Sequence, residues 1–93
     1  MALARVVSFE GVTKDRIEHL KGELEGERPE GMPAAELIVL HDPDAEQSLA
    51  IVFFENEEDY RQGDVVLGAM PSGDTPGRRV SVTRYEVAVR RTI

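Results

Sequence analysis

The apolar residues of this chain gather in four short runs. The densest run is Leu49–Phe54, in which six apolar residues, several of them β-branched or aromatic, follow one another between polar, turn-forming segments. A run this short and bounded this way predicts a strand buried on both faces. Similar runs predict strands at Arg5–Glu10, Glu36–His41 and Arg79–Arg90. The last is longer than the roughly 5–6 residues of a typical strand, so we expect a bulge or an overhang past the sheet.

A helix is predicted between the first two strands, from the spacing of its apolar residues. Within Lys14–Glu25, three apolar residues, Ile17, Leu20 and Leu24, stand at positions i, i+3 and i+7, which places them on one stripe of a helix. Thr13 precedes the segment in the N-cap position. Because the remaining positions are mostly charged or polar, this helix is expected to cover a surface on one side only.

A second helix is predicted between the third and fourth strands. Asn56 is its expected N-cap, and three carboxylates fill the first turn, where the positive end of the helix dipole favours them. Tyr60, Gly63 and Met70, with Val66 or Leu67, form the expected inward face. Pro71 ends the helix because proline cannot continue it.

The order β-α-β-β-α-β predicts a ferredoxin-like α+β domain spanning residues 1–93, with a four-stranded antiparallel sheet and both helices on one face. Two helices can cover only one side of that sheet. Since the second and third strands are apolar on both sides, the other face would expose a larger apolar patch than a monomer normally shows. The sequence therefore predicts a homodimer that packs sheet against sheet.

The element order, the apolar hairpin Glu36–Phe54, the acidic cap from Asn56 to Tyr60 and the long last strand resemble the dimeric α/β-barrel superfamily. Within it, the chain is similar to small proteins grouped with antibiotic-biosynthesis monooxygenases. The resemblance implies a homodimer with a pocket between helices and sheet. The chain has no Trp, and neither His lies in the second helix, so it lacks the Asn/Trp/His set of the haem-degrading branch. Fold likeness alone does not supply a reaction.

Charge is unevenly distributed along the chain. Residues 1–77 carry 17 acidic and 6 basic side chains, whereas residues 78–93 carry 5 arginines and only Glu86. The acidic majority argues against a nucleic-acid partner, although binding of a polyanion would involve the arginines at positions 78, 79, 84, 90 and 91. The alternative is that these arginines pair with acidic helices or with a second subunit. The absence of cysteine, of a signal-peptide pattern and of any run of about 20 apolar residues predicts a cytoplasmic protein without a membrane partner.

The residues that could carry chemistry are few. His41, Tyr60 and Tyr85 are the weak catalytic candidates, and the ligand-binding candidates are Tyr60, Ser81, Thr83, Arg84 and Tyr85. Because neighbours on a strand face opposite ways, either Tyr85 lines the pocket with Thr83 and Ser81, or Arg84 does and offers a partner to an anionic or phenolate ligand. His41, Asp42 and Asp44 could form an acid/base or metal cluster, but the favoured explanation is a hairpin tip whose carboxylates cap their own turn.

Minor candidates follow the same logic. His19 lies beside the stripe of the first helix and is expected on its surface. Ser8 and Glu10 share a face of the first strand with Val6, so Glu10 would be a base if that face lined the pocket. No H-E-x-x-H, P-loop or G-x-G-x-x-G motif is present, which predicts neither a metal nor a cofactor.

Two hypotheses follow. The first is a cofactor-independent, monooxygenase-like or isomerase-like enzyme acting on a small aromatic or polyketide-like molecule, with Tyr60, His41 or Tyr85 moving a proton or donating a hydrogen bond. The second is a non-catalytic module that binds a small ligand or serves to dimerise. A cavity of roughly 300 Å³ lined by converging polar groups would favour the first or a binder, whereas apolar side chains filling the space would argue against an enzyme.

Overall fold

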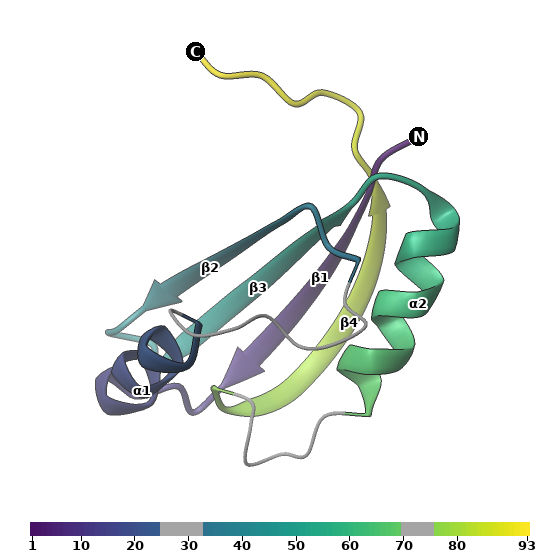
Figure 1. Ribbon diagram of the computed structural model, residues 1–93. Helices are drawn as coiled ribbons and strands as arrows, with labels where there is room; N and C mark the ends of the chain where they lie inside the picture. The colour runs from purple at the N-terminus through teal and green to yellow at the C-terminus, as the bar shows by residue number, and fades with distance from the viewer. Residues whose placement is uncertain (25–32, 70–75) are drawn as a thin grey trace.

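The computed structural model describes residues 1–24, 33–69 and 76–93. Its elements follow the predicted order β-α-β-β-α-β (Figure 1). They are β1 (Leu3–Glu10), α1 (Lys14–Leu24), β2 (Glu36–Asp42), β3 (Gln47–Phe54), α2 (Glu57–Gly68) and β4 (Arg78–Glu86).

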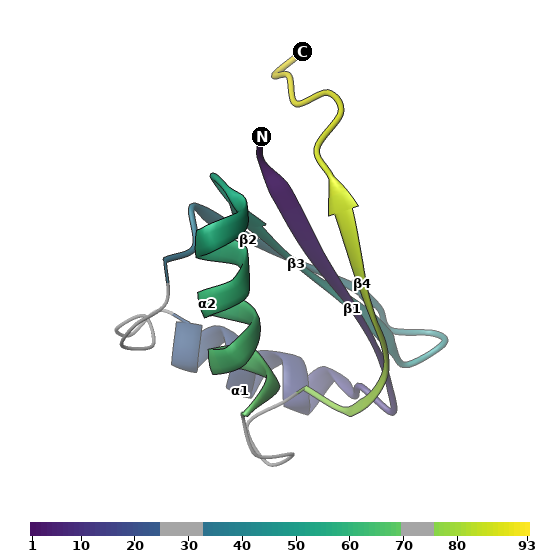
Figure 2. The same ribbon diagram turned by 90° about the vertical axis from the view of Figure 1, so that its right-hand side faces the viewer.

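The four strands form one antiparallel sheet in the order β2-β3-β1-β4. Both helices lie on the same side of this sheet (Figure 2). The protein therefore has the ferredoxin-like α+β fold. In the β1–β4 pairing the register shifts between Ser8 and Phe9, which confirms the irregularity expected for the long last strand.

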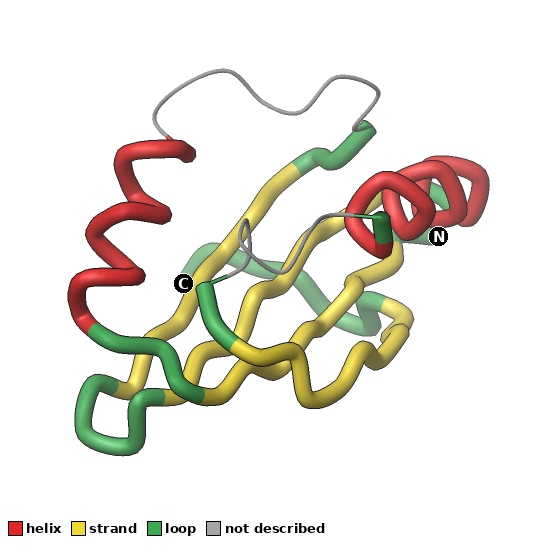
Figure 3. Tube along the Cα trace, turned by 90° about the horizontal axis from the view of Figure 1, so that it is seen from below, coloured by secondary structure: helices red, strands yellow, loops and turns green. Residues whose placement is uncertain are grey.

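Two separate apolar clusters anchor the helices, which lie over different parts of the sheet (Figure 3). Under α2, Tyr60 packs with Leu3, Val52 and Phe54, and Leu67 packs against them. Under α1, Ile17 and Val12 pack with Val7 and Phe9 of β1, with the partly buried Leu20, Val39 and Ala50 alongside. Alternate residues of β1 and β3 thus face the helices, as the twofold period of a strand requires.

Local signals in the sequence set the helix starts. The Asn56 side chain accepts a hydrogen bond from the Asp59 backbone N–H at 2.8 Å, which confirms it as the N-cap of α2. Thr13 Oγ1 accepts from the Arg16 N–H at 3.2 Å and caps α1 in the same way. Gly11 has a φ of +68°, a backbone conformation that glycine adopts without steric cost, and it turns the chain from β1 towards α1.

Two predictions about the strands are wrong. β4 ends at Glu86 rather than Arg90, so residues 87–93 leave the ladder after a last bond from the Val87 N–H to the Ala2 carbonyl. β2 is an edge strand and is not fully buried on its helix side, where Leu37 is 42% exposed. Ile38 and Leu40, on the face that no helix covers, are 37% and 50% exposed in the single chain. β3, the densest apolar run, buries only its helix side in a single chain, where Val52 and Phe54 lie in the core and Leu49 on the other face is 39% exposed.

Of the predicted inward face of α2, Tyr60 and Gly63 are buried, as expected. The expectations for Met70 and Pro71, and for the side chain of Leu24, lie outside the described residues.

Candidate functional site

A cluster of charged and aromatic side chains lies between α2 and the strands β1 and β4. Tyr60, in the first turns of α2, is 8% exposed and makes an edge-to-face contact with Phe54, with ring centroids 5.4 Å apart. The Arg84 guanidinium carbon lies 5.3 Å from the centre of the Tyr60 ring, within the range of a cation–π contact. Tyr60 therefore has an apolar side in the core and a second side among charges.

The side chain of Arg5 is 4% exposed, which is unusual for a charged residue in the middle of a sheet. Its Nε donates to Asp64 Oδ1 at 2.8 Å, and this ion pair ties β1 to α2. Asp64 is about half exposed, so water reaches one end of the pair.

Burial raises the pKa of the Tyr60 phenol above its ordinary value, and the Asp64 carboxylate adds to the increase. The positive charges of Arg5 and Arg84 act in the opposite direction. The net effect on the pKa is upward, so the Tyr60 hydroxyl carries its proton at neutral pH and is able to donate a hydrogen bond.

Two arginines of β4 reach the two ends of α2 on the helix side of the sheet. Arg84 lies 3.6 Å from Glu57 in the first turn, and Arg79 donates to the Leu67 carbonyl in the last turn at 3.2 Å. The second contact places a cation at the negative end of the helix dipole. Among the described residues, Arg79 Nε is buried without a hydrogen-bond partner.

The alternation along β4 settles which of its candidates faces the helices. Arg84 is the register partner of Arg5 and lies on the helix side, whereas Tyr85 is the partner of Ala4 and lies on the opposite face. Thr83 and Ser81, opposite Val6 and Ser8, lie on the same face as Tyr85. Of the predicted ligand-binding residues, the structure therefore brings together only Tyr60 and Arg84.

His41 has a structural contact. Its Nε2 lies 2.9 Å from the Val12 carbonyl and links β2 to the turn after β1. At the hairpin tip, Asp42 Oδ1 accepts bonds from the N–H groups of Asp44 and Ala45, so the carboxylate caps its own turn. No group of three or more His, Cys, Asp or Glu side chains in the described part of the chain is arranged to hold a metal ion.

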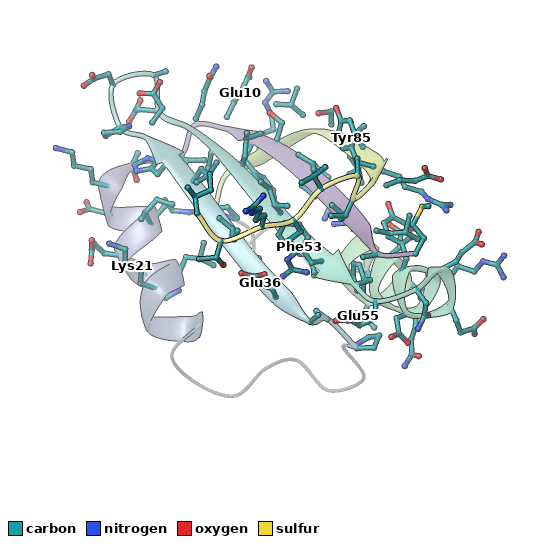
Figure 4. The ribbon with its side chains drawn as sticks, turned by 90° about the horizontal axis from the view of Figure 1, so that it is seen from above. Glu10, Lys21, Glu36, Phe53, Glu55 and Tyr85 are labelled. Carbon is teal, nitrogen blue, oxygen red and sulfur yellow. The ribbon has the colours of Figure 1, made fainter. Side chains whose placement is uncertain are left out.

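The other face of the sheet carries no helix, and we call it the open face. Its apolar centre joins three strands, and each end carries charges of both signs. Figure 4 shows Glu10, Glu36, Phe53 and Tyr85 on this face. Its centre consists of Val6, Ile38, Leu40, Leu49 and Ile51, with Ala4, Phe53 and Tyr85 towards one end.

The C-terminal segment crosses one end of the open face (Figure 4). The Arg90 guanidinium carbon lies 4.5 Å from the centre of the Phe53 ring and its group pairs with Glu36. At the opposite end of the face, Arg78 pairs with Glu10. Glu10 thus belongs to the open face and to an ion pair, not to the space under the helices.

Two residues of this cluster, Arg5 and Asp64, were not predicted from the sequence. Arg5 could have been recognised because it stands in phase with Leu3, Val7 and Phe9, all of which face the core. A charge at an inward position of an alternating strand indicates a buried polar contact. Asp64 gave no comparable signal, since acidic residues are common on the surface of a helix.

Comparison with known protein families and curated proteins found no match to this chain. No protein-family model matches it. No curated protein matches it significantly either. Among the described residues, none of the helices has the length and apolar character needed to cross a bilayer.

Proposed function

We propose that this protein is a self-associating module that forms a homodimer through the open face of its sheet. The observation that carries the proposal is the apolar centre of that face, where Ile38, Leu40 and Leu49 are 37%, 50% and 39% exposed on adjacent strands. Contiguous exposed apolar patches on a soluble domain mark interaction sites. A sheet packed about 10 Å from a second sheet buries such residues on both sides.

The size of the face suits a second copy. Four strands about 4.8 Å apart, each of about eight residues at about 3.3 Å, project an area of roughly 500 Å². Accessible surface exceeds projected area on a rough side-chain layer, so each subunit would contribute close to the roughly 800 Å² of a standard interface.

The distribution of charge on the open face also favours a twofold partner. Glu10 and Arg78 lie at one end, and Glu36 and Arg90 lie at the other. An isologous interface whose twofold axis runs across the strands brings the two ends of one subunit against the opposite ends of its partner. The end that carries Glu10 and Arg78 then meets an end with charges of both signs, so opposite charges can pair.

The proposed dimer agrees with the resemblance to the dimeric α/β-barrel superfamily and to antibiotic-biosynthesis-monooxygenase-like proteins. The feature that these proteins share is dimerisation through the sheet. An enzymatic role of that type rests on Tyr60, because His41 is bonded to the Val12 carbonyl and Tyr85 lies on the open face. Assaying turnover of hydroxylated aromatic probes tests this role. The parent protein should turn them over and the Tyr60→Phe variant should not. Without such turnover, the non-catalytic module is the better description.

Sedimentation velocity at protein concentrations of about 1–100 μM tests the dimer. Standard-size interfaces of modest affinity dissociate in this concentration range. We expect a particle of twice the 10.3 kDa chain mass at the upper end. Leu49→Lys should shift the equilibrium to the monomer, because it places a charge in the centre of the interface.

Leu37→Lys is the matched control. Leu37 is 42% exposed, close to the 39% of Leu49, but its register with the core residue Val52 places it on the helix side. This variant should dimerise as the parent does. A parent chain that sediments as a monomer throughout, or a Leu49→Lys variant that remains dimeric, would contradict the proposal.

A further inference from the structure

The strongest unexplained feature outside the open face is the pair Arg5 and Arg84. They are register partners on adjacent strands and both lie on the helix side. Like charges placed directly opposite each other in a sheet are destabilising unless something negative lies between them. The structure therefore has to neutralise two neighbouring guanidinium groups.

The nearby carboxylates do this only in part. Asp64 accepts from the Nε of Arg5, and among the described residues no acceptor is bonded to the outer edge of that guanidinium, formed by Nη1 and Nη2. Glu57 is shared, since it lies 3.6 Å from both Arg84 and Arg61, beyond a normal hydrogen-bond length. An arginine offers five N–H donors, so within the described parts of the chain most of the donors of this pair have no carboxylate bonded to them.

A third donor lies at the same place. The Arg84 guanidinium carbon lies 5.3 Å from the centre of the Tyr60 ring, and Asp64, the partner of Arg5, follows Tyr60 by one turn on the same side of α2. The described residues offer this hydroxyl no hydrogen-bond acceptor that would occupy it. Two guanidinium groups and a protonated phenol, with few acceptors, form an arrangement that recognises an oxyanion.

The surroundings select the kind of anion. Val82 lies next but one to Arg84 on the helix side of β4, opposite Val7, and is 42% exposed, so it offers an apolar contact beside the charges. Asp64 and Glu57 pair with three guanidinium groups, those of Arg5, Arg84 and Arg61, so these contacts leave one positive charge, and the chain as a whole has a net charge of −7. A dianion would meet more repulsion than a monoanion.

We propose that Arg5, Tyr60 and Arg84 form a binding site for a small monocarboxylate with an apolar body. The carboxylate accepts bonds from the outer edge of Arg5, from Arg84 and from the Tyr60 hydroxyl, and the body lies against Val82. Arg84 and Asp64, which are 47% and 49% exposed, form the rim through which the ligand enters. The site lies on the helix side and does not depend on the dimer.

Titration with benzoate, acetate and inorganic phosphate at constant ionic strength tests the site, followed by ¹H–¹⁵N NMR of the backbone amides and the arginine Nε–Hε groups. We expect saturable shifts at Arg5, Arg84 and α2, with benzoate binding more tightly than acetate because of its ring, and phosphate most weakly. Absence of a saturable response, or tighter binding of phosphate than of benzoate, would overturn the proposal.

Variants locate the binding. Because a hydrogen bond to a charged group contributes about 1.5–3 kcal/mol, Arg84→Gln and Tyr60→Phe should each weaken benzoate binding by about tenfold or more. The control is Arg78→Gln on the same strand, whose side chain pairs with Glu10 on the open face and should leave the affinity unchanged. The amide spectra report whether each variant is folded. Unchanged affinity in a folded Arg84→Gln variant would exclude this site.

Discussion

At the scale of single residues, the most consequential interaction is the Arg5–Asp64 ion pair. Arg5 is almost wholly buried, and removing its partner leaves a cation with a lost charge-assisted bond. We expect Asp64→Ala to lower the free energy of unfolding by about 1–2 kcal/mol, a value reduced from that of a fully buried pair because water reaches Asp64. Urea denaturation measures this change.

The matched control for that prediction is Glu18→Ala, which removes the exposed pair with Lys21 on α1. Exposed pairs at this spacing contribute only about 0.3–0.5 kcal/mol. Equal effects of the two substitutions would show that burial of Arg5 adds nothing to its ion pair.

Tyr60 gives a second prediction at this scale. Its pKa is higher in the folded state than the ordinary value of 10.0, so the folded protein holds this proton more tightly than the unfolded chain does. The resulting stabilisation is complete below about pH 10 and is lost as the pH rises through the folded-state pKa. Absorbance at 295 nm should show a phenol titrating above pH 10 that is absent in Tyr60→Phe. A titration of Tyr60 below pH 10 would contradict the environment described here.

At the scale of elements, α2 depends on its cap as well as on its packing. The Asn56 side chain satisfies the Asp59 N–H at 2.8 Å and precedes a first turn with three carboxylates. We expect Asn56→Ala to cost about 1 kcal/mol of stability, measured by urea denaturation, whereas Asn56→Asp should retain most of it because Asp is also a good cap.

Glu55→Ala provides the comparison for that measurement, since Glu55 is exposed and precedes the cap. It should change stability by less than about 0.5 kcal/mol. A cost at position 56 no greater than that at position 55 would mean that tertiary contacts alone hold α2 in place.

At the scale of the whole molecule, the net charge of −7 acts on the proposed dimer. Two such subunits repel each other, and salt screens that repulsion over a Debye length of about 10 Å at 0.1 M. The ion pairs at the ends of the open face are screened too, but they are few and exposed. We therefore expect the dissociation constant to fall several-fold between low and high NaCl, as measured by sedimentation. A dissociation constant that rises with salt would show that the ion pairs at the ends of the open face, rather than its apolar centre, hold the dimer together.

The sequence by itself determined the order of the elements, the caps at Thr13 and Asn56 and the inward position of Tyr60, because these depend on local periodicity and on backbone donors near each helix start. The sequence also determined that both faces of β3 are apolar. A strand pattern does not show whether the surface that packs on each face belongs to the same chain.

Only the tertiary structure decided which side of β4 faces α2, since a shift of one residue exchanges Arg84 for Tyr85. It also decided that β4 ends at Glu86, that His41 bonds to the Val12 carbonyl, and that Arg5 meets Asp64 across 59 positions of the chain. These contacts join segments far apart in the sequence, and pairing register and helix placement determine them jointly.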